Sequence, residues 1–138
     1  MKELILVGNP NVGKTTLFNS LTKSNDHTGN WHGVTVDSKL KTYTYKNEQF
    51  NIVDLPGIYS LAPYSFEEKL AVEYLYTHNE SVVINIVDIN NISKNLYLTL
   101  ELIEAKIPTI VVINKTAKIN SRINVNALKK LLGVPVFC

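Results

Sequence analysis

The sequence is poor in cysteine and in glycine, and it lacks long apolar runs. Its one cysteine, Cys138, cannot form an internal disulfide, which is typical of a protein kept in a reducing compartment. The first apolar run, residues 4–7, is too short for the core of a signal peptide, and no stretch reaches the length of a membrane span. The formal net charge is only +2, without a run of like charges, which argues against a nucleic-acid-binding function.

What remains is the composition of one globular domain, residues 1–138, with 45% hydrophobic residues. Apolar strand-like runs alternate with helical patterns, which predicts an α/β fold of βαβ units on a mostly parallel sheet. A turn at residues 46–48 indicates a hairpin that adds one antiparallel strand at the sheet edge. Strands are expected at residues 4–7, 35–45, 49–53, 82–87, 109–113 and 134–137, and helices at residues 14–21, 65–76, 93–105 and from about 128 to the stop at Gly133.

The strongest motif is GNPNVGKT at residues 8–15, directly after a predicted strand and directly before a predicted helix. Glycines let backbone N–H groups turn inward around a phosphate, and the start of the helix adds unpaired donors. Lys14 can supply positive charge to the β and γ phosphates, and the Thr15 hydroxyl can ligate Mg²⁺. The motif therefore predicts a phosphate-binding loop.

A second motif, DLPG at residues 54–57, follows another predicted strand. An aspartate at the carboxyl end of a strand beside a phosphate loop is where a Mg²⁺ site is expected, so Asp54 is the candidate. Gly57 can offer its N–H to a γ-phosphate at close approach. The loop at residues 24–34 and its end supply one further Mg²⁺ ligand candidate, Thr35, with Thr28 as the rival.

A third motif, NKTA at residues 114–117, ends the strand at 109–113. Guanine-binding domains use N-K-x-D at this place. Asn114 would contact the base and support the phosphate loop, and the Lys115 stem would cover the base. The aspartate that pairs with guanine is replaced by Ala117, and no Asp or Glu follows Glu104. Because a bidentate charge-assisted pair contributes about 1–3 kcal/mol of discrimination, guanine affinity and specificity should both fall.

These segments resemble the G domain of FeoB, the bacterial ferrous-iron transporter family. The resemblance covers nearly the whole chain and rests on GNPNVGKTTLFNSLT, GNWHGVTVDSK, DLPGIYSLAPYSFEEKLAVEYL and NLYLTLELIE. The third of these contains a capping-box pattern, Ser65 to Glu68, that marks a helix start. The resemblance implies a three-layer, Ras-like P-loop NTPase fold that binds GTP or GDP with Mg²⁺.

The resemblance also implies roles for individual residues. Asn11 would be the phosphate-loop residue linked to potassium activation, and backbone carbonyls near Gly29 and Trp31 would complete the K⁺ site. Thr35 would be the switch threonine. Ile58 stands where Ras-type enzymes place a catalytic glutamine, so hydrolysis is expected to be slow.

The motifs and the resemblance together predict three sets of residues. The catalytic residues are Lys14, Thr35 and Gly57. The Mg²⁺ ligands are Thr15, Thr35 and Asp54. The nucleotide-binding residues are Gly8, Asn9, Pro10, Asn11, Val12, Gly13, Lys14, Thr15, Thr16, Gly33, Val34, Thr35, Asp54, Leu55, Pro56, Gly57, Asn114 and Lys115.

The family joins its G domain to a helical spacer and a membrane iron permease. The resemblance therefore implies a cytoplasmic domain of a parent protein in the bacterial inner membrane, with homo-oligomers among the expected assemblies. It also implies that the chain, which ends at Cys138, stops before the last base-contacting loop and a closing helix. No cluster of Cys, His and carboxylates suits Fe²⁺, so iron chemistry would belong to the rest of such a parent.

The sequence is compatible with three activities. The first is a slow GTP hydrolase that acts as a switch. The second is a nucleotide-binding module with little hydrolysis, a pseudo-GTPase, which Ala117 and the missing base loop would favour. The third is an ATPase or relaxed NTPase, because loss of the aspartate removes a reason to reject adenine.

Overall fold

A computed structural model describes residues 2–10, 12–22, 39–114 and 125–137. The strands are β1 (Lys2–Gly8), β2 (Lys39–Tyr45), β3 (Glu48–Asp54), β4 (Val82–Asp88), β5 (Thr109–Asn114) and β6 (Val136–Phe137). The helices are α1 (Lys14–Thr22), α2 (Phe66–Thr77), α3 (Ile92–Glu104) and α4 (Val125–Leu132), with a 3₁₀ turn, η2 (Ile89–Asn91), before α3. The α/β class is confirmed.

One six-stranded sheet carries the fold, in the order β2-β3-β1-β4-β5-β6. Only the β2–β3 pair is antiparallel, and the other neighbours run parallel. The predicted edge hairpin is therefore confirmed. Its turn places Lys46 and Asn47 at φ values of 47° and 65°, a left-handed pair that matches the twist of a two-residue hairpin loop.

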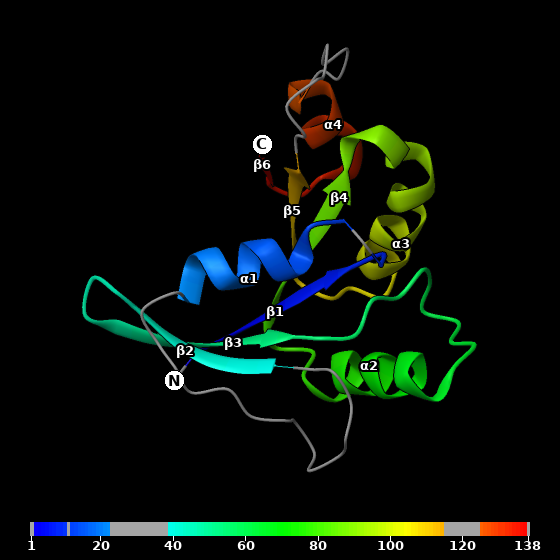
Figure 1. The fold of residues 1–138 in the computed structure, drawn as a ribbon. Helices are drawn as coiled ribbons and strands as arrows, with labels where there is room; N and C mark the ends of the chain where they lie inside the picture. The colour runs from blue at the N-terminus through cyan, green and yellow to red at the C-terminus, as the bar shows by residue number, and fades with distance from the viewer. Residues whose placement is uncertain (1, 11, 23–38, 115–124, 138) are drawn as a thin grey trace.

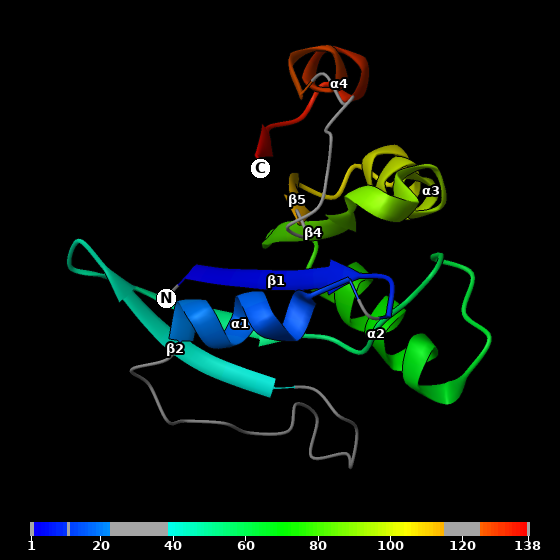
Figure 2. The same cartoon turned by 45° about the horizontal axis from the view of Figure 1, so that its top comes forward.

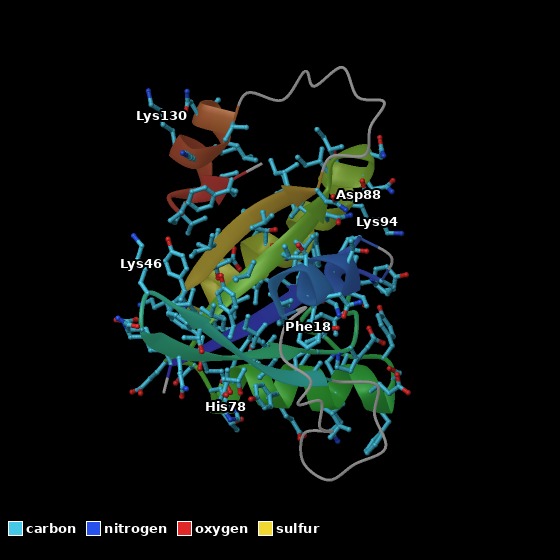
Figure 3. The ribbon with its side chains drawn as sticks, turned by 60° about the vertical axis from the view of Figure 1, so that its left-hand side comes forward. Phe18, Lys46, His78, Asp88, Lys94 and Lys130 are labelled. Carbon is cyan, nitrogen blue, oxygen red and sulfur yellow. The ribbon has the colours of Figure 1, made fainter. Side chains whose placement is uncertain are left out.

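The helices form layers on both faces of the sheet (Figures 1 and 2). Phe18 of α1 is fully buried against apolar side chains of β1, β3 and β4, and Figure 3 labels it between helix and sheet. The opposite face packs against α2 and α3, through residues such as Leu75 and Leu102. Helix α4 continues that second layer over β5 and β6. The three-layer prediction is confirmed.

Local signals in the sequence fix two helix ends. The Ser65 side chain accepts from the Glu68 N–H at 3.0 Å, and the Glu68 carboxylate accepts from the Ser65 N–H at 3.0 Å. This reciprocal capping box starts α2 where the sequence predicts it. Gly133 ends α4 with a φ of 72°, and its N–H donates to the Lys129 carbonyl at 2.9 Å.

The predicted strands differ from the observed ones by one or two residues at one or both ends, and the edge strand can be compared only from Lys39 onward. The sequence predicts a last strand from residue 134, but the observed strand begins at Val136. Pro135 has no N–H to donate to the neighbouring strand. Its carbonyl still accepts from the Val111 N–H at 2.9 Å. The edge strand predicted at 35–45 is described from Lys39, and residues 35–38 lie outside the described part.

The parallel strands bring their carboxyl ends to one edge of the sheet. Gly8, Asp54, Asp88 and Asn114 are the last residues of β1, β3, β4 and β5. Loops at this edge of an open α/β sheet are where ligands bind. None of the helices that the structure describes is long and apolar enough to cross a membrane.

Candidate functional site

The phosphate loop connects β1 to α1 and is shaped by two glycines. Gly8 leaves β1 so close to β4 that a Cβ atom there would lie 2.8 Å from the Ile86 carbonyl oxygen. Gly13 has a φ of 88°, which L side chains rarely adopt, and its carbonyl accepts the first α-helical bond from the Leu17 N–H at 3.0 Å. Both glycines are therefore required by the backbone path.

Asn114 holds the loop from the end of β5. Its Nδ2 atom donates to the Val12 carbonyl at 2.8 Å, and a Cβ atom at Gly13 would overlap that same nitrogen. The prediction that Asn114 supports the phosphate loop is confirmed.

Lys14 and Asp54 meet across the site. The Lys14 ammonium forms an ion pair with the Asp54 carboxylate, and the two side chains are 11% and 4% exposed. A charged pair that is this deeply buried is expensive to assemble, so it indicates that the surrounding chain fixes both groups in place. The motif at residues 8–15 and the motif at residues 54–57 thus lie side by side, as the sequence predicts.

Gly57 touches the phosphate loop directly. A Cβ atom at Gly57 would lie 2.9 Å from the Cα, Cγ and N atoms of Pro10. The next residue, Ile58, donates its N–H to the Gly8 carbonyl at 3.0 Å, and its side chain is fully buried in the core. Ile58 therefore presents no side chain to the site.

The open side of these groups is a cleft of about 500 Å³. Its walls come from the phosphate loop, the start of α1, the segment after β3 and the first turn of α2, namely Pro10, Gly13, Lys14, Thr15, Thr16, Asp54, Leu55, Pro56, Gly57 and Glu67. The exposed Thr15 hydroxyl and the buried Asp54 carboxylate are oxygen donors of the kind Mg²⁺ prefers. The donor set therefore fits this metal.

A second cleft of about 440 Å³ adjoins the first and shares Gly13 and Thr16 with it. Asn114 and Ser20 supply its other polar side chains, and Leu17, Ile86, Val112 and Ile113 line the rest. A mostly apolar slot with a few polar atoms suits a flat aromatic base.

Not all predicted residues can be placed. Among the predicted site residues, Asn11, Gly29, Trp31, Gly33, Val34, Thr35 and Lys115 lie outside the described part of the chain, as do Thr28 and Ala117. Of the other predicted nucleotide-binding residues, all but Gly8, Asn9 and Val12 line one of the two clefts. Asn9 is buried behind the loop, and its Oδ1 atom has no hydrogen-bond partner among the described residues.

One residue of the cleft, Glu67, was missed by the sequence reasoning. It is exposed and belongs to the first turn of α2. The capping box could have indicated it, because a helix that starts at Ser65 after a short loop from Gly57 must bring its first turn near the cleft. Within the described ranges, no three His, Cys, Asp or Glu residues are grouped in a way that could hold a metal ion.

Comparison with known proteins identifies the family. Residues 2–138 match the family model described as ferrous iron transport protein B. The chain belongs to this family, FeoB. It is 46% identical over 145 aligned positions to the Fe(2+) transporter FeoB of Escherichia coli K12, and the match covers 99% of the chain. It spans only 19% of that transporter's length.

Solved FeoB structures share the fold. The G domain of T. maritima FeoB superposes with a TM-score of 0.89 at 41% identity, covering 99% of this chain and 86% of that one. A GDP-bound mutant of S. thermophilus FeoB superposes with a TM-score of 0.85 at 44% identity, covering all of this chain and 56% of that one. The Ras-like G-domain fold that the sequence predicts is confirmed.

Proposed function

We propose that the chain is the guanine-nucleotide-binding domain of a ferrous iron transporter and that it hydrolyses GTP slowly. The observation that carries the proposal is the meeting of Lys14, Asp54 and Gly57 around one cleft beside the phosphate loop. Fold alone does not determine function, but these residue types at these positions have a defined task in phosphate chemistry.

The phosphates would lie along the loop and the start of α1. There the backbone N–H groups and the positive end of the helix favour negative charge. Lys14 faces the cleft, so its ammonium can exchange the Asp54 carboxylate for phosphate oxygens. The Gly57 backbone lies against Pro10 of the loop, so its N–H would be within reach of a γ-phosphate bound there.

Thr15 and Asp54 would hold Mg²⁺, with Thr35 as a further ligand from the loop before β2. A Mg²⁺ ion held by these residues would supply positive charge that offsets the charge of the phosphates. Lys14 and the loop backbone would keep the phosphates in line with an attacking water. Asn11, with backbone groups near Gly29 and Trp31, would supply a K⁺ site.

Hydrolysis would be slow because no side chain next to Gly57 can orient the water. The Ile58 side chain is apolar and fully buried in the core, so it cannot orient the attacking water. The same observation supports the second candidate function, a pseudo-GTPase that binds nucleotide with little hydrolysis.

Base selection would depend on Asn114 and the second cleft. Within the described residues, that cleft has no carboxylate, and the sequence places Ala117 where the family's base-pairing aspartate is expected. We therefore infer weakened discrimination between guanine and adenine.

In a full-length parent, the domain would lie on the cytoplasmic side of the bacterial inner membrane. It would connect through a helical spacer to the membrane permease that carries Fe²⁺, and homo-oligomers are among the expected assemblies. Nucleotide state would then act on transport through the loops around Thr35 and Gly57.

Calorimetric titration with GDP and with ADP in Mg²⁺ buffer tests the proposal. The slow-GTPase function predicts a GDP affinity at least about tenfold higher, a gap of roughly 1.4 kcal/mol. Equal affinities would show that base choice is lost, and an Ala117→Asp variant should then restore it. Binding of neither nucleotide would contradict the proposal.

Phosphate release separates the two candidate functions. A slow hydrolase should release phosphate from GTP faster in K⁺ than in Na⁺. A protein that binds GTP but releases no phosphate in either salt would be a pseudo-GTPase.

A further inference from the structure

Strand β4 carries a polar residue in the middle of an apolar run. Its sequence is VVINIVD, and the asparagine, Asn85, is only 1% exposed. Asn85 lies between Val7 of β1 and Val111 of β5 in the sheet register. Burying an amide costs free energy unless it is hydrogen-bonded. The phosphate and base chemistry described above makes no use of Asn85.

The Asn85 amide is bonded on both sides. Its Nδ2 atom donates to the Val7 carbonyl at 3.3 Å, and its Oδ1 atom accepts from the Thr99 hydroxyl of α3. Thr99 is completely buried. A continuous polar connection therefore runs from the end of β1, through β4, to the helix behind the sheet.

Helix α3 extends the connection to the end of β4. Asn95 lies one helical turn before Thr99 and is 4% exposed. Its Oδ1 atom accepts from the Asp88 N–H at 3.1 Å, and its Nδ2 atom donates to the Asn91 carbonyl at 2.9 Å. Figure 3 labels Asp88 and Lys94 at this end of α3.

The connection ends where the phosphate loop begins. Val7 is followed by Gly8, whose Cα approaches β4 so closely that a Cβ would lie 2.8 Å from the Ile86 carbonyl oxygen. Ile86 is the neighbour of Asn85. β1 and β4 thus approach each other closely beside the Val7–Asn85 bond, and a change there would be passed directly to Gly8 and the loop.

A well-packed apolar pair could replace Asn85 and Thr99 at little cost in stability. The hydrogen-bonded pair is directional: the bond between Asn85 and Thr99 fixes the orientation and the register of α3 relative to β4, which apolar contact does not. We propose that Asn85 and Thr99 are positioning residues that hold the root of the phosphate loop in its nucleotide-binding geometry. This inference rests on the proposed nucleotide-binding function.

A matched pair of threonine variants tests the inference. Thr109 is also buried, at 6% exposure, and its hydroxyl donates to the Ile107 carbonyl at 2.8 Å, just as the Thr99 hydroxyl donates to Asn85 and, at 3.5 Å, to the Asn95 carbonyl. Thr99→Val and Thr109→Val therefore remove the same atoms from similar surroundings. Thr99→Val should lower GDP affinity at least fivefold, while Thr109→Val should leave it within twofold and Thr99→Ser should preserve it. Equal affinities in folded Thr99→Val and Thr109→Val would overturn the inference.

A double variant covers the case in which Thr99→Val alone does not fold. Asn85→Val combined with Thr99→Val replaces both partners by apolar groups, so no buried amide is left unpaired. The double variant should fold and still bind GDP at least fivefold more weakly than the wild type. Wild-type affinity in the folded double variant would overturn the inference.

Amide hydrogen exchange without nucleotide separates this inference from the proposed function. In Thr99→Val, or in the double variant, the amides of residues 8, 9 and 12–16 should exchange at least fivefold faster than in Thr109→Val. This result does not depend on nucleotide binding, so it stands even if the wild-type protein binds none. Unchanged exchange would overturn the positioning role.

Discussion

The two ends of the sheet have hollows of similar size but opposite chemistry. The cleft at the carboxyl ends of the strands and the hollow lined by Lys2, Glu3, Phe50 and Glu80 at the other end each have a volume of about 500 Å³. Volume alone therefore does not distinguish a nucleotide site from a surface depression.

Polar groups at the amino end are satisfied by one another. The Glu3 carboxylate accepts from the Tyr74 hydroxyl at 2.6 Å and from the Ser81 hydroxyl at 2.8 Å. The Tyr74 ring stacks on His78 with centroids 3.8 Å apart, and Figure 3 shows His78 far from Asp88 and Lys94. This arrangement stabilises the fold and leaves little for a ligand.

Polar groups at the carboxyl end border a cleft, where Lys14 and Asp54 pair with each other. Lys14, Thr15 and Asp54 line the cleft, and glycine contacts bring two loops together beside them. The comparison teaches that the site is identified by a buried ion pair in the wall of a cleft and by close backbone approach. Substitutions at the carboxyl end should therefore change nucleotide affinity, and those at the amino end should change only stability.

The largest effect is expected from Gly13→Ala, with Gly133→Ala as its control. Both glycines have positive φ, but a Cβ at Gly13 would overlap Asn114, whereas nothing lies within 4 Å of one at Gly133. Gly13→Ala should weaken GDP binding more than about 1,000-fold, or roughly 4.1 kcal/mol, by calorimetry. Gly133→Ala should cost only about 1 kcal/mol of stability. Similar GDP affinities in the two variants would refute the role of the close approach.

A smaller loss is expected from Lys14→Met, with Lys2→Met as the control ion pair. The Lys14–Asp54 pair is buried, whereas the side chains of Lys2 and Glu48 are 71% and 57% exposed at 3.3 Å. Lys14→Met should lower GDP affinity about 100-fold, or roughly 2.7 kcal/mol. Lys2→Met should leave affinity unchanged and cost about 0.2–1 kcal/mol of stability in chemical denaturation. An unchanged affinity in Lys14→Met would contradict the account.

Tyr74→Phe should change stability and its pH dependence but not GDP affinity. Loss of the bond to the Glu3 carboxylate should cost about 1.5–3 kcal/mol of unfolding free energy. Burial, reinforced by the bond to Glu3 and its charge, raises the pKa of Tyr74. Because the folded pKa is above the unfolded value of about 10, this contribution is present below pH 10 and is lost as the pH rises further.

Denaturation from pH 8 to pH 11 therefore measures this contribution. The stability advantage of the wild type over Tyr74→Phe should shrink above pH 10. A stability advantage that stays constant over this range would contradict the raised pKa of Tyr74. A fall in GDP affinity in Tyr74→Phe would contradict the claim that the amino end of the sheet affects stability alone.

The smallest effect is expected from Ser65→Ala, which removes the capping box of α2. The variant should lose about 1 kcal/mol of stability, as helix caps commonly do. GDP affinity should fall less than twofold, because Ser65 does not line the cleft, although the neighbouring Glu67 does. Thermal denaturation and calorimetry check both values, and a tenfold loss of affinity would show that the start of α2 positions the site.

Sequence alone predicts most of the fold because its local signals are strong. The capping box at Ser65, the stop at Gly133 and the alternation of strands and helices all have direct physical causes. The phosphate loop and Asp54 were predicted for the same reason, since their chemistry requires particular residues at fixed spacing.

The missed features depend on tertiary contacts. Glu67 approaches the cleft only through the path of the loop before α2, and Asn85 meets Thr99 only because α3 packs on β4. Asn85 and Thr99 have no spacing that sequence periodicity could reveal, and the capping box at Ser65 was the signal that could have indicated Glu67. The shorter last strand reflects Pro135, whose missing N–H outweighs the apolar pattern around it.

Amide chemical-shift mapping of the labelled protein during titration with Mg²⁺ and GDP tests the central claim most directly. The account predicts large shifts in residues 8, 9, 12–16, 54, 55, 57 and 114, and none at Glu3, Tyr74 or Ser81. Shifts concentrated at the amino end of the sheet, or no shifts at saturating GDP, would contradict the assignment of the nucleotide site to the carboxyl end.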